Sequence, residues 1–241
     1  MKKIKKALLL VTSAGALVAA SVLGTMAYLT STDTVANTFT VGNVNILLDE
    51  LDVDKTTDTD NTDITTGEGT DTQRDRENKY HLLPGHTYVK DPTVTVQTGS
   101  EDSYVRMMVK VEGLDDLKNA MPKNEFPEFY NEDIFLLQML CVDENDVSTW
   151  ENTKWEFETF HNADDAKYPN TYEFRYYTTA NEESGPQGDG VLESLFGKIT
   201  VPGKVNNEQL AHLGNVNIVV TAHAIQADGF DDADDAWKAF D

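Results

Sequence analysis

The sequence predicts an all-β fold, a jelly-roll-like β-sandwich with short helices and a mobile acidic insertion. Many short segments either alternate between apolar and polar residues or are apolar throughout, and clusters of Gly, Pro, Asn and Asp separate them. Helical spacing is confined to a few short segments. Short strands joined by such turns are typical of sandwiches with Greek-key or jelly-roll connections.

The first residues predict a secretory signal peptide. Four lysines precede an apolar run of 18 residues at 7–24, and the small residue Ala27 follows it. We expect cleavage between Ala27 and Tyr28. The alternative is a transmembrane anchor, because a span needs about 17–25 apolar residues. The hydroxyl and glycine residues within the run favour the cleaved peptide, and hence a chain without a stable membrane anchor.

The rest of the chain, residues 28–241, is predicted to form one domain. It is long enough to bury one core, and no linker divides it. Its single cysteine, Cys141, has no intramolecular partner, so a hydrophobic core or association between chains has to hold the fold. We expect Cys141 to be a small buried apolar side chain rather than a reactive thiol.

Strong negative charge excludes several classes of partner. The formal net charge is −23, and removal of the four lysines within residues 1–27 makes it −27. Nucleic acids are excluded because their binding draws its affinity from Lys and Arg. An anionic membrane surface is disfavoured for the same reason. Divalent cations, basic partners or simple solubility outside the cell remain open.

The first half of the domain is predicted to hold three strands and the insertion. The first strand covers residues 38–48, with a bulge or bend at Gly42-Asn43. Residues 55–78 are rich in Asp and Thr and nearly lack large apolar residues, so they cannot repay the entropy of ordering. Strands at 88–97 and 103–112 follow, and the second has the clearest period-two alternation of the chain.

The second half is predicted to add two helices and five strands. Residues 114–130 have helical spacing that Pro122 interrupts, which predicts a short helix and a loop. A second helix at 232–240 would be capped by Asp231, with Trp237 and Phe240 packed against the domain. The strands are predicted at 134–142, 153–159, 171–179, 197–202 and 215–225.

No motif for catalysis or metal binding stands out, so we predict that the chain is not an enzyme and binds no metal or cofactor. The histidines, at 81, 86, 161, 212 and 223, lack the His-Glu-x-x-His spacing, and no serine lies in Gly-x-Ser-x-Gly. We expect these histidines in turns or on the surface. Asp63 occupies the place where an EF-hand loop needs Gly. A weak calcium site in the insertion or at residues 231–235 remains the alternative to a solvated acidic surface.

Several segments, in order along nearly the whole chain, match one family of exported proteins. They are Ala27 to Thr30, Asn37 to Gly42, Leu83-Pro84-Gly85, Val94 to Val96, Tyr104 to Arg106, Ala222 to Phe230 and Ala236-Trp237. Together they resemble the TasA and camelysin (CalY) family of Gram-positive bacteria. Residues 114–190 match this family only loosely.

The resemblance implies export through a SipW-type signal peptidase and a jelly-roll β-sandwich that assembles into extracellular fibres of the biofilm matrix. In such fibres the N-terminal segment of one subunit completes the sheet of the next. A head-to-tail contact of this kind does not close, so it produces filaments. We expect a secreted protein of the matrix or cell surface that self-associates through a flexible segment at 28–37. The residues assigned to its assembly strand are Tyr28, Leu29, Thr30, Val35 and Phe39.

Two other functions remain as alternatives. Camelysin is described as a metalloprotease, which makes a secreted metalloendopeptidase one alternative, although this chain offers no motif for it. The other is a surface adhesin or binding module that does not polymerise, because a fold does not fix a function.

Overall fold

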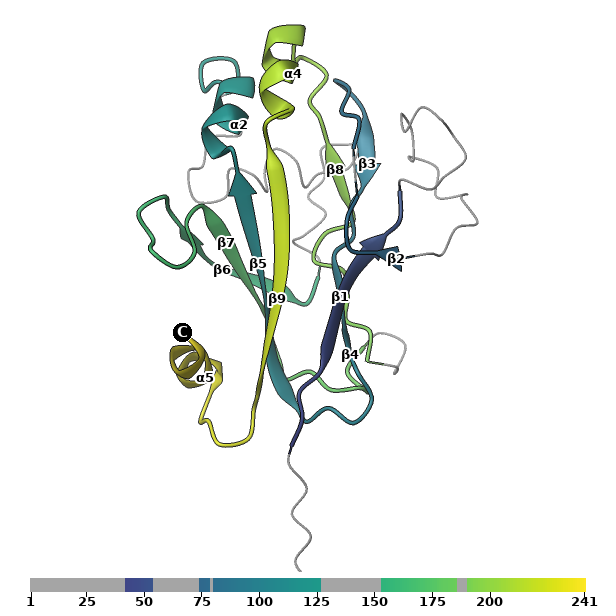
Figure 1. Ribbon diagram of the computed structural model, residues 1–241, viewed down its shortest axis with the longest axis vertical. Coiled ribbons are helices and arrows are strands. Elements are labelled where there is room, and N and C mark those ends of the chain that lie inside the picture. The colour runs from purple at the N-terminus through teal and green to yellow at the C-terminus, as the bar shows by residue number, and fades with distance from the viewer. Residues whose placement is uncertain (1–41, 54–73, 79, 127–152, 186–189) are drawn as a thin grey trace, which may run out of the picture. The chain divides into compact units, whose positions relative to one another are not determined.

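The computed structural model describes residues 42–53, 74–78, 80–126, 153–185 and 190–241, all within one compact unit, Gly42–Asp241. These residues form nine strands and three short helices (Figure 1). The fold is therefore predominantly β, as the sequence predicts. The strand predicted at 134–142, and Cys141 within it, lie outside the described residues.

The largest sheet has four antiparallel strands in the order β6-β7-β5-β9. Strand β5 (Ser103–Glu112) pairs along all ten residues with β9 (Asn217–Gln226), and on its other side with β7 (Thr171–Tyr176). Strand β6 (Trp155–His161) lies beyond β7, with a register shift between Phe157 and Thr159. This confirms the strand predicted at 103–112. Its apolar residues at alternate positions face the core.

Two smaller sheets complete the β structure. One has the order β2-β1-β4, formed by Arg74–Asp75, Ile46–Leu51 and Thr93–Val96. The other pairs β3 (Thr87–Val89) with β8 (Lys198–Thr200).

The single strand predicted at 88–97 is wrong, because the chain changes sheets between β3 and β4. The intervening groups bond elsewhere: the Lys90 amide donates to the Gly197 carbonyl, and the Asp91 carboxylate accepts from the Leu51 amide. Pro92 has no amide hydrogen to continue a ladder. The chain therefore changes sheets at residues 90–92, which form no ladder of hydrogen bonds with a neighbouring strand.

The segments before and after the predicted insertion also differ from expectation. Strand β1 begins at Ile46 rather than at residue 38, and residues 42–45 are outside any strand. Within residues 74–78, which we predicted to be mobile, Arg74 and Asp75 pair with β1, and the Asn78 side chain bonds the backbone of Leu51 and Val53. The remainder of the predicted insertion, residues 55–73, lies outside the described residues.

Of the helices, α2 (Leu114–Ala120) confirms the short helix predicted before Pro122. Helix α4 (Asn207–Leu213) was not predicted, although Asn206 and Gln209 form a capping box at its start. Helix α5 (Ala233–Phe240) was predicted, but its N-cap is Asp232 rather than Asp231.

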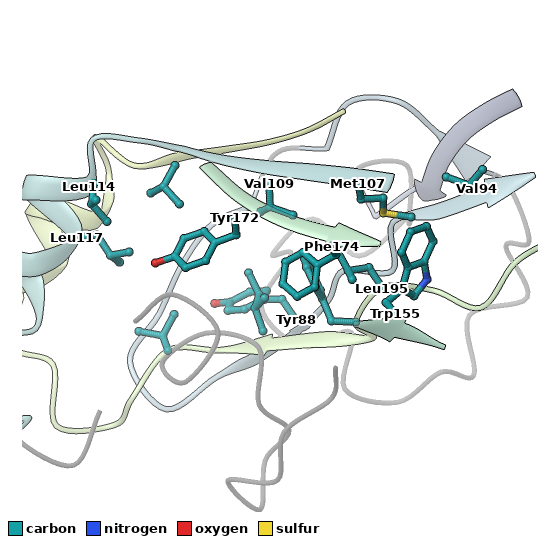
Figure 2. Packing of buried hydrophobic residues seen from close by; sticks show 14 of the residues in the cluster. Tyr88, Val94, Met107, Val109, Leu114, Leu117, Trp155, Tyr172, Phe174 and Leu195 are labelled. Carbon is teal, nitrogen blue, oxygen red and sulfur yellow. The ribbon is translucent and has the colours of Figure 1, made fainter. Parts of the chain in front are cut away.

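One hydrophobic core joins all three sheets. On β5, the alternate residues Val105, Met107, Val109 and Val111 are at most 1% exposed. They share the core with aromatic residues of β7 and apolar residues of α2 (Figure 2). Other members are Tyr88, Val94, Val96, Leu117, Trp155, Tyr172, Phe174, Leu195 and Ile199. The three sheets are therefore held by the same burial of apolar surface.

Truncation of Phe174 to alanine should lower the free energy of unfolding by about 3–5 kcal/mol, because its fully buried ring would leave a cavity in this shared core. Urea unfolding followed by circular dichroism measures the change. Tyr177→Ala is the matched control, since that ring is 58% exposed. Equal losses in the two variants would contradict the described core.

Candidate functional site

A cavity of about 910 Å³ opens between β1 and β9. Its walls include Leu48 of β1 and Ile218 and Val220 of β9. Ile199 of β8 and Leu210 and Leu213 of α4 add further apolar surface. We call this cavity the β1–β9 groove. Charged residues of β1 and of residues 75–78 line another part of it, so the groove combines apolar and charged surface.

Of the two strands that border the groove, β9 is an edge strand and β1 is paired on both sides only in part. Strand β9 is the last strand of its sheet, and among the described residues it pairs only with β5. Strand β1 pairs with β4 through residues Ile46 to Asp49, whereas β2 covers only Glu50 and Leu51 on its other side. Edge strands carry unpaired backbone N–H and C=O groups that can bond an added strand.

The apolar face of β9 is less buried than the matching face of its neighbour. Ile218 and Val220 lie directly opposite the fully buried Val111 and Val109, yet both are only half-buried. The same holds for Ala222 and Ala224. The core covers β5 completely and β9 only in part, so β9 exposes a line of apolar surface along the groove.

Ion pairs fix the wall of the groove formed by β1 and its neighbours. The Lys90 ammonium is nearly buried, bonds the Glu50 carboxylate at 2.7 Å and lies 5.6 Å from the centre of the Tyr80 ring. The Arg74 guanidinium joins the Asp49 carboxylate of β1 to that of Asp91. These contacts tie β2 and the segment between β3 and β4 to β1, which shapes the groove in advance of any occupant.

The described chain begins at the opposite end of β1 from the groove. Asn43 and Asn45 accept hydrogen bonds from the amides of Glu101 and Gln97, next to the turn before β5. The groove instead is lined by the later residues of β1, Leu48 to Glu50, and by the first residues of β9. Any segment that precedes Gly42 therefore joins the domain at the end remote from the groove.

The sequence-predicted site residues all precede Gly42 and lie outside the described residues. Both the cleavage site and the assembly strand therefore stay predictions. They are Ala27 and Tyr28 for cleavage, and Tyr28, Leu29, Thr30, Val35 and Phe39 for assembly.

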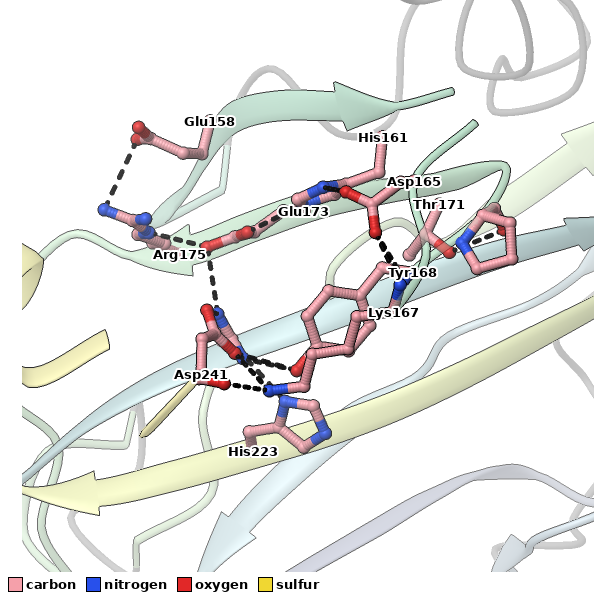
Figure 3. A network of polar contacts seen from close by, with 12 residues as sticks. Glu158, His161, Asp165, Lys167, Tyr168, Thr171, Glu173, Arg175, His223 and Asp241 are labelled. Atoms are coloured by element: carbon pink, nitrogen blue, oxygen red, sulfur yellow. Dashed lines mark hydrogen bonds and ion pairs between the residues drawn. The ribbon is translucent and has the colours of Figure 1, made fainter. Parts of the chain in front are cut away.

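A second polar cluster lies on the other face of the four-stranded sheet (Figure 3). Its centre is Arg106 of β5, which is fully buried. The guanidinium donates to both carboxylate oxygens of Asp241, at 2.9 and 2.6 Å, and to the Tyr168 hydroxyl at 3.0 Å. Its third nitrogen, Nε, donates to Nδ1 of His223 at 3.2 Å. We call this group of residues the Arg106 cluster.

The electrostatics of the Arg106 cluster favour ion pairing rather than proton transfer. The hydrogen bond from Arg106 lowers the pKa of the Asp241 carboxyl far below its ordinary value, with help from Tyr168 and Lys167. Burial opposes the ionisation of Glu173, but hydrogen bonds from Arg175 and His161 outweigh it and lower that pKa too. Both carboxyls are therefore ionised at neutral pH.

Two histidines were wrongly predicted to be turn or surface residues. His161 bonds Asp165 at 2.9 Å and Glu173 at 3.1 Å through its two ring nitrogens. His223 is half-buried beside Arg106. Within the described part of the chain, no group of three or more His, Cys, Asp and Glu residues is arranged to hold a metal ion. The clustered acids at 231–235 instead begin α5, where Asp232 accepts from the Asp235 amide.

The Arg106 cluster attaches α5 to the sheet. The guanidinium lies 4.4 Å from the centre of the Trp237 ring and 5.1 Å from that of Phe240. Trp237 is buried as predicted, whereas Phe240 is 40% exposed and does not pack down fully. Sequence reasoning missed this cluster, because Asp241 is 135 residues from Arg106 and no local pattern connects them.

Replacement of Asp241 by asparagine should lower the free energy of unfolding at pH 7 by about 1–3 kcal/mol, the usual value of a charged hydrogen bond. A carboxyl whose folded pKa is lowered stabilises the fold above its unfolded pKa of about 3.9 and loses this effect as pH falls further. The difference from the wild type, measured by urea unfolding, should be constant from pH 5 to 8 and shrink below about pH 4. Asp235→Asn, at an exposed pair with Lys238, is the control and should change little.

Comparisons with known proteins do not assign the chain to a family. No family model, no curated protein and no solved structure matches it. In the ranges that the structure describes, no helix is both long enough and apolar enough to cross a membrane. The function therefore has to be argued from the residues of the chain itself.

Proposed function

We propose that this chain is an exported structural protein that assembles into extracellular fibres of the biofilm matrix. Each subunit donates its N-terminal segment as a strand to the next subunit, after a SipW-type signal peptidase has cleaved between Ala27 and Tyr28. The proposal includes a jelly-roll β-sandwich fold and kinship with the TasA and camelysin family. The single observation that carries it is the β1–β9 groove, which lies between β1 and the edge strand β9 and is lined in part by apolar residues.

The groove has the features of a site that accepts a strand. Backbone groups along the edges of β1 and β9 can bond an added strand, which supplies affinity without regard to sequence. The half-buried residues Ile218 and Val220 would be covered by the side chains of that strand. Burial of apolar surface contributes about 25 cal/mol per Å², so a strand with one apolar face would stabilise the subunit that receives it.

The N-terminal segment offers such a face. In an extended strand successive side chains point to opposite sides, so Leu29, Val35, Phe39 and Val41 would share one side. On this side Ser31, Asp33 and Asn37 interrupt the apolar residues. Fourteen residues precede Gly42 after cleavage, and they reach roughly 46 Å when extended.

The ends of β1 give the contact its direction. The donated segment would leave from the Gly42 end, and the groove that accepts it is lined by the far end of β1. Donor and acceptor are therefore different surfaces, and a contact between different surfaces generates open chains unless the rotation closes a ring. This polarity supports filaments rather than a closed dimer.

The same groove also supports a second candidate function. Its volume of about 910 Å³ is within the range of about 300–1,000 Å³ that is typical of small-molecule sites. A binding module that does not polymerise would use the groove for a ligand instead of a strand. No described residue favours the metalloendopeptidase alternative.

Purified residues 28–241 should form filaments over time or on acidification, because protonation of carboxylates reduces the repulsion among 27 net negative charges. Electron microscopy and light scattering detect the filaments. Deletion of residues 28–37 should abolish them while the circular dichroism spectrum stays unchanged. A chain that remains monomeric under all these conditions would contradict the fibre proposal. Filaments from the chain that lacks residues 28–37 would exclude strand donation by this segment.

Substitution of Ile218 by asparagine should weaken assembly strongly, because it places a polar group on the groove side of β9. The matched control is Thr221→Asn on the same strand, because Thr221 is exposed and is not among the residues that line the groove. Sedimentation after a fixed incubation measures the assembled fraction of each variant.

A mixture of two variants shows whether Ile218→Asn assembles poorly because its groove is altered. The chain lacking residues 28–37 retains the groove, whereas Ile218→Asn retains the donor segment. Together they should give short capped complexes, seen by analytical ultracentrifugation, but no filaments. Equal assembly of the Ile218 and Thr221 variants would contradict a role of the groove in assembly.

A further inference from the structure

The attachment of α5 depends on a histidine that can receive a proton. His223 of β9 lies directly opposite Arg106 of β5 in the strand register. Its ring is 4.9 Å from the Phe240 ring of α5, at an angle of 30°. It is also 6.3 Å from the ring of Tyr168. His223 is thus placed between the buried guanidinium and the helix that covers it.

The hydrogen bond from Arg106 fixes the protonation state of His223. A guanidinium has only donors, so Nδ1 of His223 has to accept with a lone pair. The imidazole is therefore neutral and carries its single proton on Nε2. The neutral imidazole therefore accepts the hydrogen bond of the buried Arg106 Nε–H group.

We propose that His223 is a proton-sensitive element that loosens α5 from the sheet when the surroundings become mildly acidic. A proton on Nδ1 removes the acceptor of the Arg106 Nε–H and places two cations 3.2 Å apart. Movement of α5 away from the sheet brings water to the imidazolium and relieves the repulsion. The Trp237 and Phe240 rings then leave the face of Arg106.

All charged groups that face His223 come from four elements. Arg106 of β5 and Lys167 of the β6–β7 connection oppose its protonation, whereas Asp241 after α5 and Glu173 of β7 favour it. The Tyr168 hydroxyl bonds Arg106 and Asp241 rather than the imidazole. Burial is the largest influence, and together with Arg106 it lowers the pKa of His223 below its ordinary value.

The sign of the response follows from this lowered pKa. Movement of α5 off the sheet removes part of the burial of His223 and raises its pKa toward the ordinary value of about 6.5, so this undocked state binds more protons than the docked state. Docking is therefore strongest above about pH 6.5 and weakens as pH falls toward the lowered pKa. Asp241 and Glu173, whose pKa values are also lowered, stay ionised over the same range. Neither carboxyl therefore accounts for a response between pH 5 and 6.5, and the His223→Gln variant tests whether His223 does.

Amide hydrogen exchange of peptides covering residues 232–241 tests the inference in the chain of residues 28–241. The concentration is kept where light scattering shows no assembly, so the result does not depend on the fibre proposal. After correction for the intrinsic rate, the opening constant should rise from pH 7.5 to 5.0 by about tenfold for each unit by which docking lowers the pKa. His223→Gln should remove this rise, because its amide oxygen can accept from Arg106 but does not titrate.

His212→Gln is the matched control, since His212 lies on α4 and bonds Asp116. It should keep the rise in full. A wild-type opening constant that does not change with pH, or an equal rise in His223→Gln, would overturn the inference.

A measurement on the unmodified chain covers the case in which His223→Gln fails to fold. Mass spectrometry of deuterium exchange at the imidazole carbon between the ring nitrogens follows the titration of His223. Its midpoint should lie below 6.5, and the opening of α5 should follow the same pH range. A midpoint at or above 6.5 contradicts the inference regardless of the variants.

Discussion

The antiparallel pairing of β5 with β9 over ten residues is the constraint on which both sites depend. Because side chains alternate along β5, Val105, Met107, Val109 and Val111 lie in the core on one face, and Arg106 lies on the other face. The same register sets Ile218 and Val220 beside the groove and His223 beside Arg106. A shift by one residue would reverse both faces at once, since side chains alternate with a period of two. The groove and the Arg106 cluster are thus the two faces of a single strand pair.

The edge position of β9 explains why one face of this pair stays open. A central strand such as β5 has neighbours on both sides, and its apolar side chains are covered completely. Strand β9 has a neighbour on one side only among the described residues, and its apolar side chains remain half-buried. An exposed edge with apolar side chains is an aggregation hazard in a monomer. In a subunit that receives a strand, the same edge becomes the binding site.

The sequence predicted those parts of the fold that depend on neighbouring residues. The alternation of 103–112 located β5, and Pro122 located the end of the helix at 114–120. It did not predict the change of sheets between β3 and β4, because partners distant in the chain decide it. Helix α4 carries a local signal, the Asn206–Gln209 capping box, that was overlooked. The groove and the Arg106–Asp241 pair are formed by tertiary contacts alone, so no local sequence pattern predicts them.

Acid acts on the parts of this molecule in a definite order. His223 responds first, because its transition lies between the ordinary value of about 6.5 and its lowered pKa. Carboxyl groups ordinarily titrate near pH 4, and their protonation reduces the net negative charge that opposes association. Asp241 is protonated last, since Arg106 holds its pKa far below that range. In the proposed response of His223, loosening of α5 precedes this loss of repulsion, so the face that α5 covers would become accessible while the molecules still repel each other.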